Sequence, residues 1–274
     1  MVKLGTIAAI GFDESDPHEL LGCYRQLGCQ VVQAYRNQGR HVSLSEMRDA
    51  IAAGGMPCDS LHGIFGEHID PSSPDEQTRR FAVDIYKREA ELADTLGGKL
   101  VVVHCSTIRE AGVSSEEHAR RTEQLKKSIA ELGAFGLGAG VTFAFENMPG
   151  YHAIGSDVGA LAGILTDTAA PNTGMCFDCG HANMVGDPVA AVAKTDGTMI
   201  YAHISDNSGN GDDHEMITCG TIDADALAEA MHRIGYDGTF MLEVFHSADR
   251  IRKLIDEGLT QRLERIINLA NGKE

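Results

Sequence analysis

The chain has 274 residues, of which 43% are hydrophobic; 40 acidic residues against 23 basic ones give a formal net charge of −17. This composition supports one large core, and the negative charge disfavours binding to nucleic acid or to an anionic membrane. The seven cysteines lack regular spacing, and the chain lacks both an N-terminal signal segment and an apolar run of about 18 residues, so we expect a cytoplasmic protein without membrane spans.

Short apolar segments alternate with amphipathic segments along the whole chain. The apolar segments predict strands at residues 4–10, 29–35, 58–62, 99–104, 141–146, 174–178, 199–204 and 239–245. The amphipathic segments predict helices at residues 18–27, 43–53, 75–96, 115–133, 156–167, 188–194, 223–234 and 248–270. Eight uninterrupted strand–helix pairs favour an α/β fold, a single (β/α)8 TIM barrel that forms one domain over residues 1–274.

The predicted helices begin and end at recognisable capping residues. Asp187 followed by Pro188 fits an N-cap and the first residue of a helix. Capping boxes are predicted at Ser43 with Glu46 and at Ser114 with Glu117. Glycines are expected to end helices at positions 28, 97, 133 and 235.

The clearest functional signal lies at the ends of six predicted strands. The segments DSLH, VVVH, FAFE, MCFD, IYAH and FMLE end at His62, His104, Glu146, Asp178, His203 and Glu243. Because the carboxyl ends of barrel strands meet on one face, we expect these side chains to converge. Buried carboxylates are costly unless they are paired or coordinated, so their convergence predicts a bound divalent cation.

The last four predicted strands supply a compact set of ligands, Glu146, Asp178, His203 and Glu243. Three carboxylates with one imidazole suit Mn, Mg, Co or Zn, and differ from the thiolate sets of structural zinc sites. Such an ion would polarise a substrate carbonyl and stabilise an enediolate, while Glu146 and Glu243 act as acid and base. Any one of these residues alone could equally be a polar strand end, but four together favour a metal site.

Several segments around these strand ends resemble a known family. VTFAFENMPG, GMCFDCGHANMVGDP, IYAHISDN, GTID and GYDGTFMLEV are similar to the xylose isomerase-like barrel superfamily, in particular its sugar phosphate isomerase/epimerase branch. The resemblance implies a divalent-metal-dependent isomerase or epimerase of a small sugar or polyhydroxy carbonyl compound. It also implies that the four ligands hold one ion and that His181 contacts the substrate. Tagatose-3-epimerase-like members carry an arginine soon after the seventh-strand histidine, whereas this chain reads HISDNSGNGDDH, so the substrate class stays open.

The same superfamily contains endonuclease IV, which provides an alternative. The ligand set of its three zinc ions is matched in order and type by His62, His104, Glu146, Asp178, His181, His203, Asp212, His214 and Glu243. A phosphodiesterase acting on abasic DNA is therefore the second interpretation, and a non-catalytic barrel that binds a sugar or metal is the third. For an isomerase, the residues outside the single-metal set would contact substrate, namely His62, His104, His181, Asp212 and His214.

Further residues complete the predicted site. Arg36, Arg40 and Arg109 fall in loops at the same end and could hold a phosphate or carboxylate of the substrate. Aromatic walls are expected from Phe12, Tyr35, Phe65 and Tyr151. The cysteines of the CFDC segment, Cys176 and Cys179, are predicted to pack in the core. The sequence leaves the substrate, the identity of the ion and the possibility of a homo-oligomer open.

Overall fold

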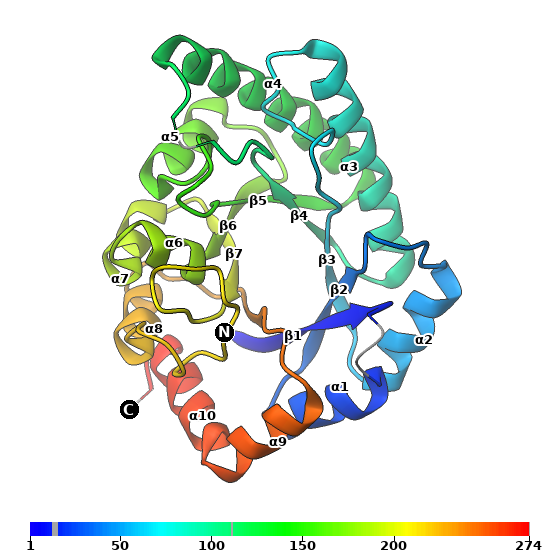
Figure 1. Ribbon diagram of the computed structural model, residues 1–274, viewed down its shortest axis with the longest axis vertical. Helices are drawn as coiled ribbons and strands as arrows, with labels where there is room; N and C mark the ends of the chain where they lie inside the picture. The colour runs from blue at the N-terminus through cyan, green and yellow to red at the C-terminus, as the bar shows by residue number, and fades with distance from the viewer. Residues whose placement is uncertain (13–15, 111, 274) are drawn as a thin grey trace.

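Eight parallel strands close into a barrel in chain order in the computed structural model, which describes residues 1–12, 16–110 and 112–273 (Figure 1). The strands are β1 (Lys3–Ile10), β2 (Val31–Arg36), β3 (Cys58–His62), β4 (Leu100–His104), β5 (Thr142–Glu146), β6 (Thr173–Asp178), β7 (Met199–Ile204) and β8 (Thr239–Leu242). The pairing of β1 with β8 closes the ring. The predicted (β/α)8 barrel is therefore confirmed.

Helices surround the barrel on its outer face (Figure 1). They are α1 (Pro17–Gln26), α2 (Leu44–Gly54), α3 (Glu76–Leu96), α4 (Ser115–Ala139), α5 (Val158–Thr168), α6 (Cys179–Val185), α7 (Pro188–Val192), α8 (Ala224–Arg233), α9 (Ala248–Asp256) and α10 (Leu259–Ala270). Among the described residues, no helix is both long enough and apolar enough to cross a membrane.

The capping predictions hold at most helix starts. Ser43 and Glu46 form both hydrogen bonds of a capping box, and the Asp187 side chain caps α7, with Pro188 as its first residue. Ser114 accepts a hydrogen bond from the backbone amide of Glu117, which is half of the predicted box. Local hydrogen bonding thus sets these boundaries as the sequence indicates.

The prediction that Gly133 ends a helix is wrong, because α4 continues to Ala139 and is capped by Gly140. Gly133 lies inside the helix, where a Cβ atom would come 2.5 Å from the carbonyl oxygen of Pro171. Its missing side chain therefore allows α4 to approach the chain that leads into β6. Close packing, rather than a turn, explains this glycine.

Two further boundaries differ from the predictions. The helix predicted at 248–270 is two helices, because Gly258 adopts a left-handed φ of 89° between α9 and α10. Helix α6, which follows β6 without a loop, was not predicted. Its sequence CGHANMV is short and interrupted by glycine, so it carries little helical periodicity of its own.

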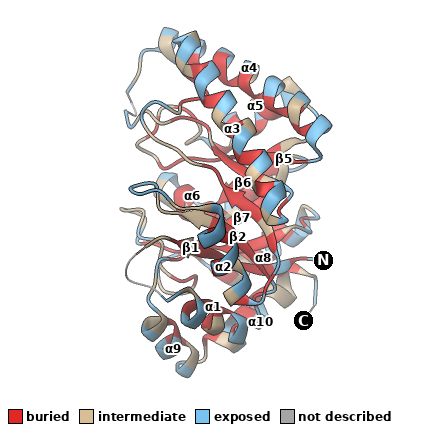
Figure 2. Ribbon diagram, turned by 90° about the vertical axis from the view of Figure 1, so that its right-hand side faces the viewer, coloured by how far each residue is buried: buried red, intermediate tan, exposed pale blue. Residues whose placement is uncertain are grey.

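Buried apolar side chains fill two spaces, one between the strands and the helices and one inside the barrel. Figure 2 shows the strands almost entirely in the buried colour. The interior group consists of Val31, Val102, Ala144, Cys176, Tyr201 and Met241. These residues form a floor below the strand ends, and Cys176 and Cys179 are both buried free thiols, as predicted.

A buried ionic seam joins α3 to α4. Arg79, whose exposure is only 1%, lies 2.8 Å from Glu76 and 2.7 Å from Glu131. Arg121 lies 2.9 Å from both Asp70 and Glu117. Both guanidinium groups therefore have two carboxylate partners, and Asp70 ties the β3–α3 loop to the seam.

Candidate functional site

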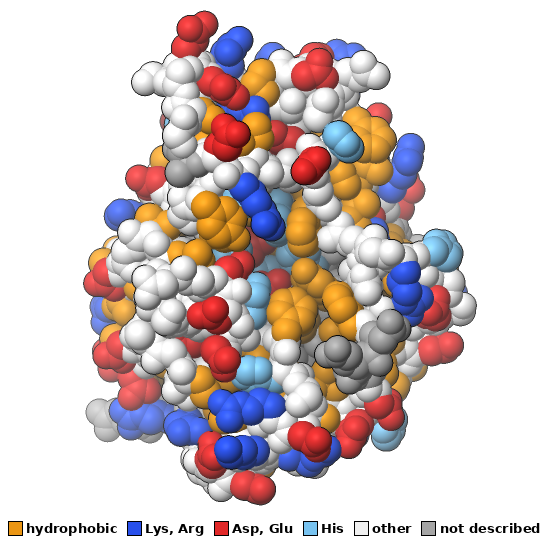
Figure 3. Space-filling view, in the orientation of Figure 1, with side chains coloured by type: hydrophobic (Ala, Val, Ile, Leu, Met, Phe, Trp, Pro, Cys, Tyr) orange, Lys and Arg blue, Asp and Glu red, His pale blue; other side chains and the backbone are white. Residues whose placement is uncertain are grey.

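The carboxyl ends of the strands open into a cavity of about 740 Å³. Figure 3 shows it as a central hollow with histidine side chains in its depth. The predicted site residues that line it are His62, His104, Glu146, His181, Asp212, His214 and Glu243. Asp178 and His203 are fully buried beneath them. The strand ends, with α6 and the loop after β7, therefore bring together the nine residues predicted as metal ligands or substrate contacts.

Glu146, Asp178, His203 and Glu243 form the tightest group, which we call the tetrad. Their ligand atoms all lie within 4.8 Å of one another. His203 Nδ1 is 2.8 Å from Glu146 Oε1, 3.0 Å from Glu243 Oε2 and 3.9 Å from Asp178 Oδ2. One imidazole nitrogen thus faces three carboxylates across one small volume.

Among the described residues, three buried carboxylate oxygens of the tetrad have no hydrogen-bond partner: Glu146 Oε2, Asp178 Oδ2 and Glu243 Oε2. His203 Nδ1 lies nearest to Glu146 Oε1, at 2.8 Å, and one ring nitrogen cannot satisfy all the oxygens that face it. Leaving buried carboxylate oxygens unpaired costs several kcal/mol, on the order of 1–3 for each polar group. A divalent cation would satisfy them, and oxygen donors with one imidazole fit such an ion.

The local sequence around β5 and β6 positions Asp178. Asn147 accepts a hydrogen bond from the Asp178 amide at 2.8 Å and donates one to its carbonyl at 2.9 Å. Asp178 Oδ1 in turn accepts from the His181 amide at 2.7 Å and caps α6. Asp178 therefore starts a helix with one oxygen and faces the tetrad with the other.

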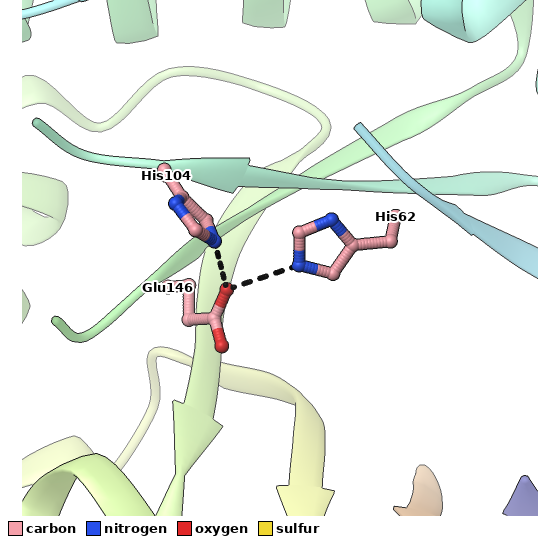
Figure 4. A group of neighbouring side chains, drawn as sticks. All are labelled: His62, His104 and Glu146. Carbon is pink, nitrogen blue, oxygen red and sulfur yellow. Dashed lines mark ion pairs between the residues drawn. The ribbon is translucent and has the colours of Figure 1, made fainter. Parts of the chain in front are cut away.

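His62 and His104 form a second group with Glu146 (Figure 4). Glu146 Oε2 lies 3.3 Å from His104 Nε2 and 3.7 Å from His62 Nε2. His62 Nε2 is also 3.8 Å from Glu243 Oε1. His62 consequently lies beside both glutamates, and its ring stacks on that of His203 with 5.7 Å between the ring centres.

The third group is held together by Asp212, which lies 3.4 Å from His181 Nε2 and 3.4 Å from His214 Nε2. The second ring nitrogen of each histidine faces a backbone carbonyl, that of Asn147 for His181 and that of Glu243 for His214. Since a carbonyl oxygen can only accept, both Nδ1 atoms donate. These contacts fix the orientation of both rings along one wall of the cavity.

The pKa values of the three acids in the tetrad are shifted in different directions by their surroundings. Burial raises the pKa of Asp178 to about 7. Burial also opposes ionisation of Glu146 and Glu243, but the charge on His203 outweighs it, so the pKa of Glu146 falls well below its usual range and that of Glu243 to about 2. His181 is buried as well, yet Asp178 and Asp212 raise its pKa to about 10. The glutamates are therefore ionised, as ligands or bases must be.

Aromatic side chains form another part of the cavity wall, which we call the aromatic wall. Tyr35 and Phe65 line it, with Tyr35 4.8 Å from the His62 ring and Phe65 stacked 4.2 Å from the His104 ring. Phe12 packs behind Tyr35 at 6.1 Å. Phe245, which sequence reasoning missed, lies 5.3 Å from Tyr35.

The three arginines that could have held a substrate anion lie in different surroundings. Arg36 forms an ion pair with Glu89 at 2.6 Å, and Arg40 forms one with Glu46 at 3.0 Å. Arg109 lines the cavity, 5.5 Å from the ring centre of Tyr151. An anion-binding role is therefore no longer supported for Arg36 and Arg40.

Sequence reasoning also missed three buried polar residues at the site, Gln33, Asn147 and His152. Gln33 Oε1 lies 3.1 Å from His203 Nε2, and His152 lines the cavity. Gln33 interrupts the apolar strand VVQAYR, and Asn147 directly follows Glu146. A buried polar residue inside an apolar strand was the available signal for Gln33.

A family model described as xylose isomerase-like TIM barrel matches residues 23–263. The chain belongs to this family. The resemblance inferred from the strand-end segments is thereby confirmed.

Individual proteins and solved structures resemble the chain over most of its length. An uncharacterised protein of Methanocaldococcus jannaschii is 29% identical over 70% of this chain and 66% of its own length, just under two thirds. A ketose 3-epimerase of Arthrobacter globiformis is 26% identical over 82% of this chain and 76% of that enzyme. The solved structure of a D-tagatose 3-epimerase-like protein covers 99% of both chains, with a TM-score of 0.75 and 22% identity, and shares the fold.

Proposed function

We propose that this protein is a divalent-metal-dependent isomerase or epimerase of a small sugar or polyhydroxy carbonyl compound. The observation that carries the proposal is the tetrad, in which three carboxylates with unpartnered oxygens surround His203 Nδ1 below a cavity. Membership of the xylose isomerase-like family and the similarity to a ketose 3-epimerase support the choice of substrate class.

The tetrad residues would hold the cation through His203 Nδ1 and through oxygens of Glu146, Asp178 and Glu243. A bound divalent ion would polarise the substrate carbonyl and stabilise the negative charge that develops on its oxygen. The aromatic wall, with Tyr35 and Phe65, and the polar wall, with His181 and His214, would orient the carbon chain between them.

The two oxygens of each glutamate face different groups, so one oxygen could bind the cation while the other exchanges a proton with the substrate. Glu146 Oε1 and Glu243 Oε2 face His203 Nδ1, whereas Glu146 Oε2 and Glu243 Oε1 face His62. One carboxylate would remove the proton from the carbon beside the carbonyl and later release it to solvent. The other, after taking up a proton from solvent, would deliver that proton to the opposite face. The product is the epimer; return of the proton to the neighbouring carbon would give the isomer.

The histidines around this pair have supporting roles in the proposal. His62 Nε2 lies within 3.8 Å of an oxygen of both glutamates and would hydrogen-bond a substrate hydroxyl between them. His104 and the Asp212-linked pair, His181 and His214, offer further contacts to hydroxyl groups.

Isotope exchange tests the proposal directly. The chain, loaded in turn with Mn²⁺, Co²⁺, Mg²⁺ or Zn²⁺, is incubated in D₂O with ketoses, hydroxypyruvate-like acids and inosose-type compounds. We expect deuterium to enter the substrate at the carbon beside the carbonyl, with loss of exchange in Glu146→Gln and Glu243→Gln. If both variants retain every detected turnover, the acid/base assignment is wrong.

Metal stoichiometry separates this proposal from a phosphodiesterase of the endonuclease IV type. We expect about one ion per chain by elemental analysis, because a single cation would occupy all four residues of the tetrad. About three ions per chain, together with cleavage of abasic DNA, would favour the phosphodiesterase instead.

A further inference from the structure

Gln33 is a buried residue whose side chain, among the described residues, has a hydrogen-bond partner only in the tetrad. It lies on β2 with no exposed surface, and its Oε1 is 3.1 Å from His203 Nε2. Its Nε2 is buried and has no partner in the part of the chain that the structure describes. A half-satisfied amide inside a barrel costs stability relative to an apolar residue of similar size. Gln33 is therefore poorly explained as a contribution to folding.

The contact with His203 crosses the barrel, because β2 and β7 are not neighbours in the ring and the two residues are 170 positions apart in the chain. The two ring nitrogens of His203 consequently face different groups. Nδ1 faces the carboxylates of the tetrad, and Nε2 faces the carbonyl oxygen of the Gln33 amide.

This arrangement decides which nitrogen of His203 can bind a cation. An imidazole coordinates a metal through an unprotonated nitrogen, so the proton of a neutral His203 must be on Nε2 if Nδ1 is the ligand. An amide oxygen accepts a hydrogen bond from Nε2–H and thereby favours this tautomer. Metal-binding histidines usually have such an acceptor on their second nitrogen, and its loss weakens metal affinity about 10–100-fold.

We propose that Gln33 is a positioning residue that holds His203 in the tautomer with a free Nδ1 lone pair, and so sets the affinity of the tetrad for its cation. This inference rests on the proposed function, because it requires the tetrad to bind a divalent ion.

The test compares two substitutions at Gln33. Methionine has a similar size but no carbonyl acceptor, whereas glutamate retains an acceptor oxygen. We expect Gln33→Met to bind Co²⁺ about 10–100-fold more weakly than the parent chain in competition with a chromophoric chelator. We expect Gln33→Glu to recover affinity to within a few-fold of the parent.

Gln124 provides the matched control. It is also a buried glutamine and lies in the α3–α4 seam region, but both polar atoms of its side chain are paired. Its amide nitrogen donates to Glu76 at 3.0 Å, and its amide oxygen accepts from Lys127 at 2.7 Å. We expect Gln124→Met to lower the denaturation midpoint of the metal-free chain and to leave Co²⁺ affinity unchanged. We expect Gln33→Met to weaken Co²⁺ binding without lowering the denaturation midpoint of the metal-free chain. A purely structural role for Gln33 would not produce this result.

Nitrogen NMR of the Zn²⁺-loaded chain, with ¹⁵N-labelled histidine, reports the tautomer itself. We expect His203 to carry its proton on Nε2, and a proton on Nδ1 would overturn the inference.

The binding data distinguish failure of this inference from failure of the proposed function. If the parent chain binds no divalent ion, the proposed function fails and the inference fails with it. If the parent chain binds one ion and Gln33→Met binds it equally tightly, or Gln33→Glu binds as weakly as Gln33→Met, only the inference is refuted.

Discussion

The α3–α4 seam and the tetrad both bury charged side chains, and the two are built differently. In the α3–α4 seam, Arg79 and Arg121 each lie within 2.9 Å of two carboxylates. In the tetrad, three carboxylates face one another around a single imidazole, and three of their oxygens have no hydrogen-bond partner among the described residues. Each arginine of the seam has two carboxylate partners, whereas the carboxylates of the tetrad outnumber their imidazole, an imbalance that a bound cation would offset.

This difference separates structural from functional charge. A buried ion pair with all its partners stabilises one arrangement of two helices, and removing either partner leaves an uncompensated charge. A cluster of like charges destabilises the fold unless something binds there, so its presence at the bottom of a cavity supports a binding site. Substitutions in the seam should therefore change stability, and those in the tetrad should change chemistry.

The largest expected effect concerns the two glutamates of the tetrad. Glu146→Gln or Glu243→Gln should lower kcat for the deuterium-exchanging substrate about 10²–10⁴-fold, because proton transfer loses its carboxylate. The denaturation midpoint of the metal-free chain should stay the same or rise, since one of several like charges is removed. Glu131→Gln, at the half-exposed edge of the seam, serves as the control with unchanged kcat. Equal kcat losses in all three variants would contradict the distinction.

Arg79→Met tests the seam from the opposite side. It should lower the free energy of unfolding by about 2–4 kcal/mol, because Glu76, Glu131 and Ser128 lose a buried partner. The partners are partly exposed, which keeps the loss below that of a fully buried pair. Chemical denaturation measures the change, and kcat/KM of the folded variant should match the parent. A variant of parental stability but reduced kcat would reverse the roles that we assign to the two regions.

Metal removal should affect the tetrad alone. A cation at 100 times its Kd stabilises the folded state by about 2.7 kcal/mol, so chelation should lower Tm in the parent chain. Asp178→Asn should lose this metal-dependent part of the Tm, whereas Arg79→Met should retain it. The measurement is a pair of thermal scans with and without the ion, and a metal response in Asp178→Asn equal to that of the parent would argue against the tetrad as the site.

The smallest effect is expected at the aromatic wall. Phe245→Leu should raise KM a few-fold, since an aromatic contact contributes about 1 kcal/mol, and it should leave kcat within about twofold of the parent. Steady-state kinetics on the deuterium-exchanging substrate measures both constants. A large fall in kcat would place Phe245 among the groups that act on the reacting carbon.

Sequence patterns predicted the strands and the convergence of the tetrad because both depend on local periodicity and on the geometry of a closed barrel. They missed Gln33 and Phe245, whose partners His203 and Tyr35 lie far away in the chain. The break at Gly258 and the continuation of α4 through Gly133 depend on backbone packing that hydrophobic periodicity does not describe. Local signals thus located the tetrad residues, while contacts between elements distant in the chain determine how their side chains are oriented.

The double engagement of Asp178 restricts what can replace it. One oxygen starts α6 by accepting the His181 amide at 2.7 Å, and the other lies unpaired toward the tetrad. Asparagine would preserve the helix start but lose the charge, and glutamate would preserve the charge but move both oxygens one carbon farther from the backbone. Geometry and charge together therefore constrain this position, because any substitution would alter the turn into α6, the centre of the site, or both.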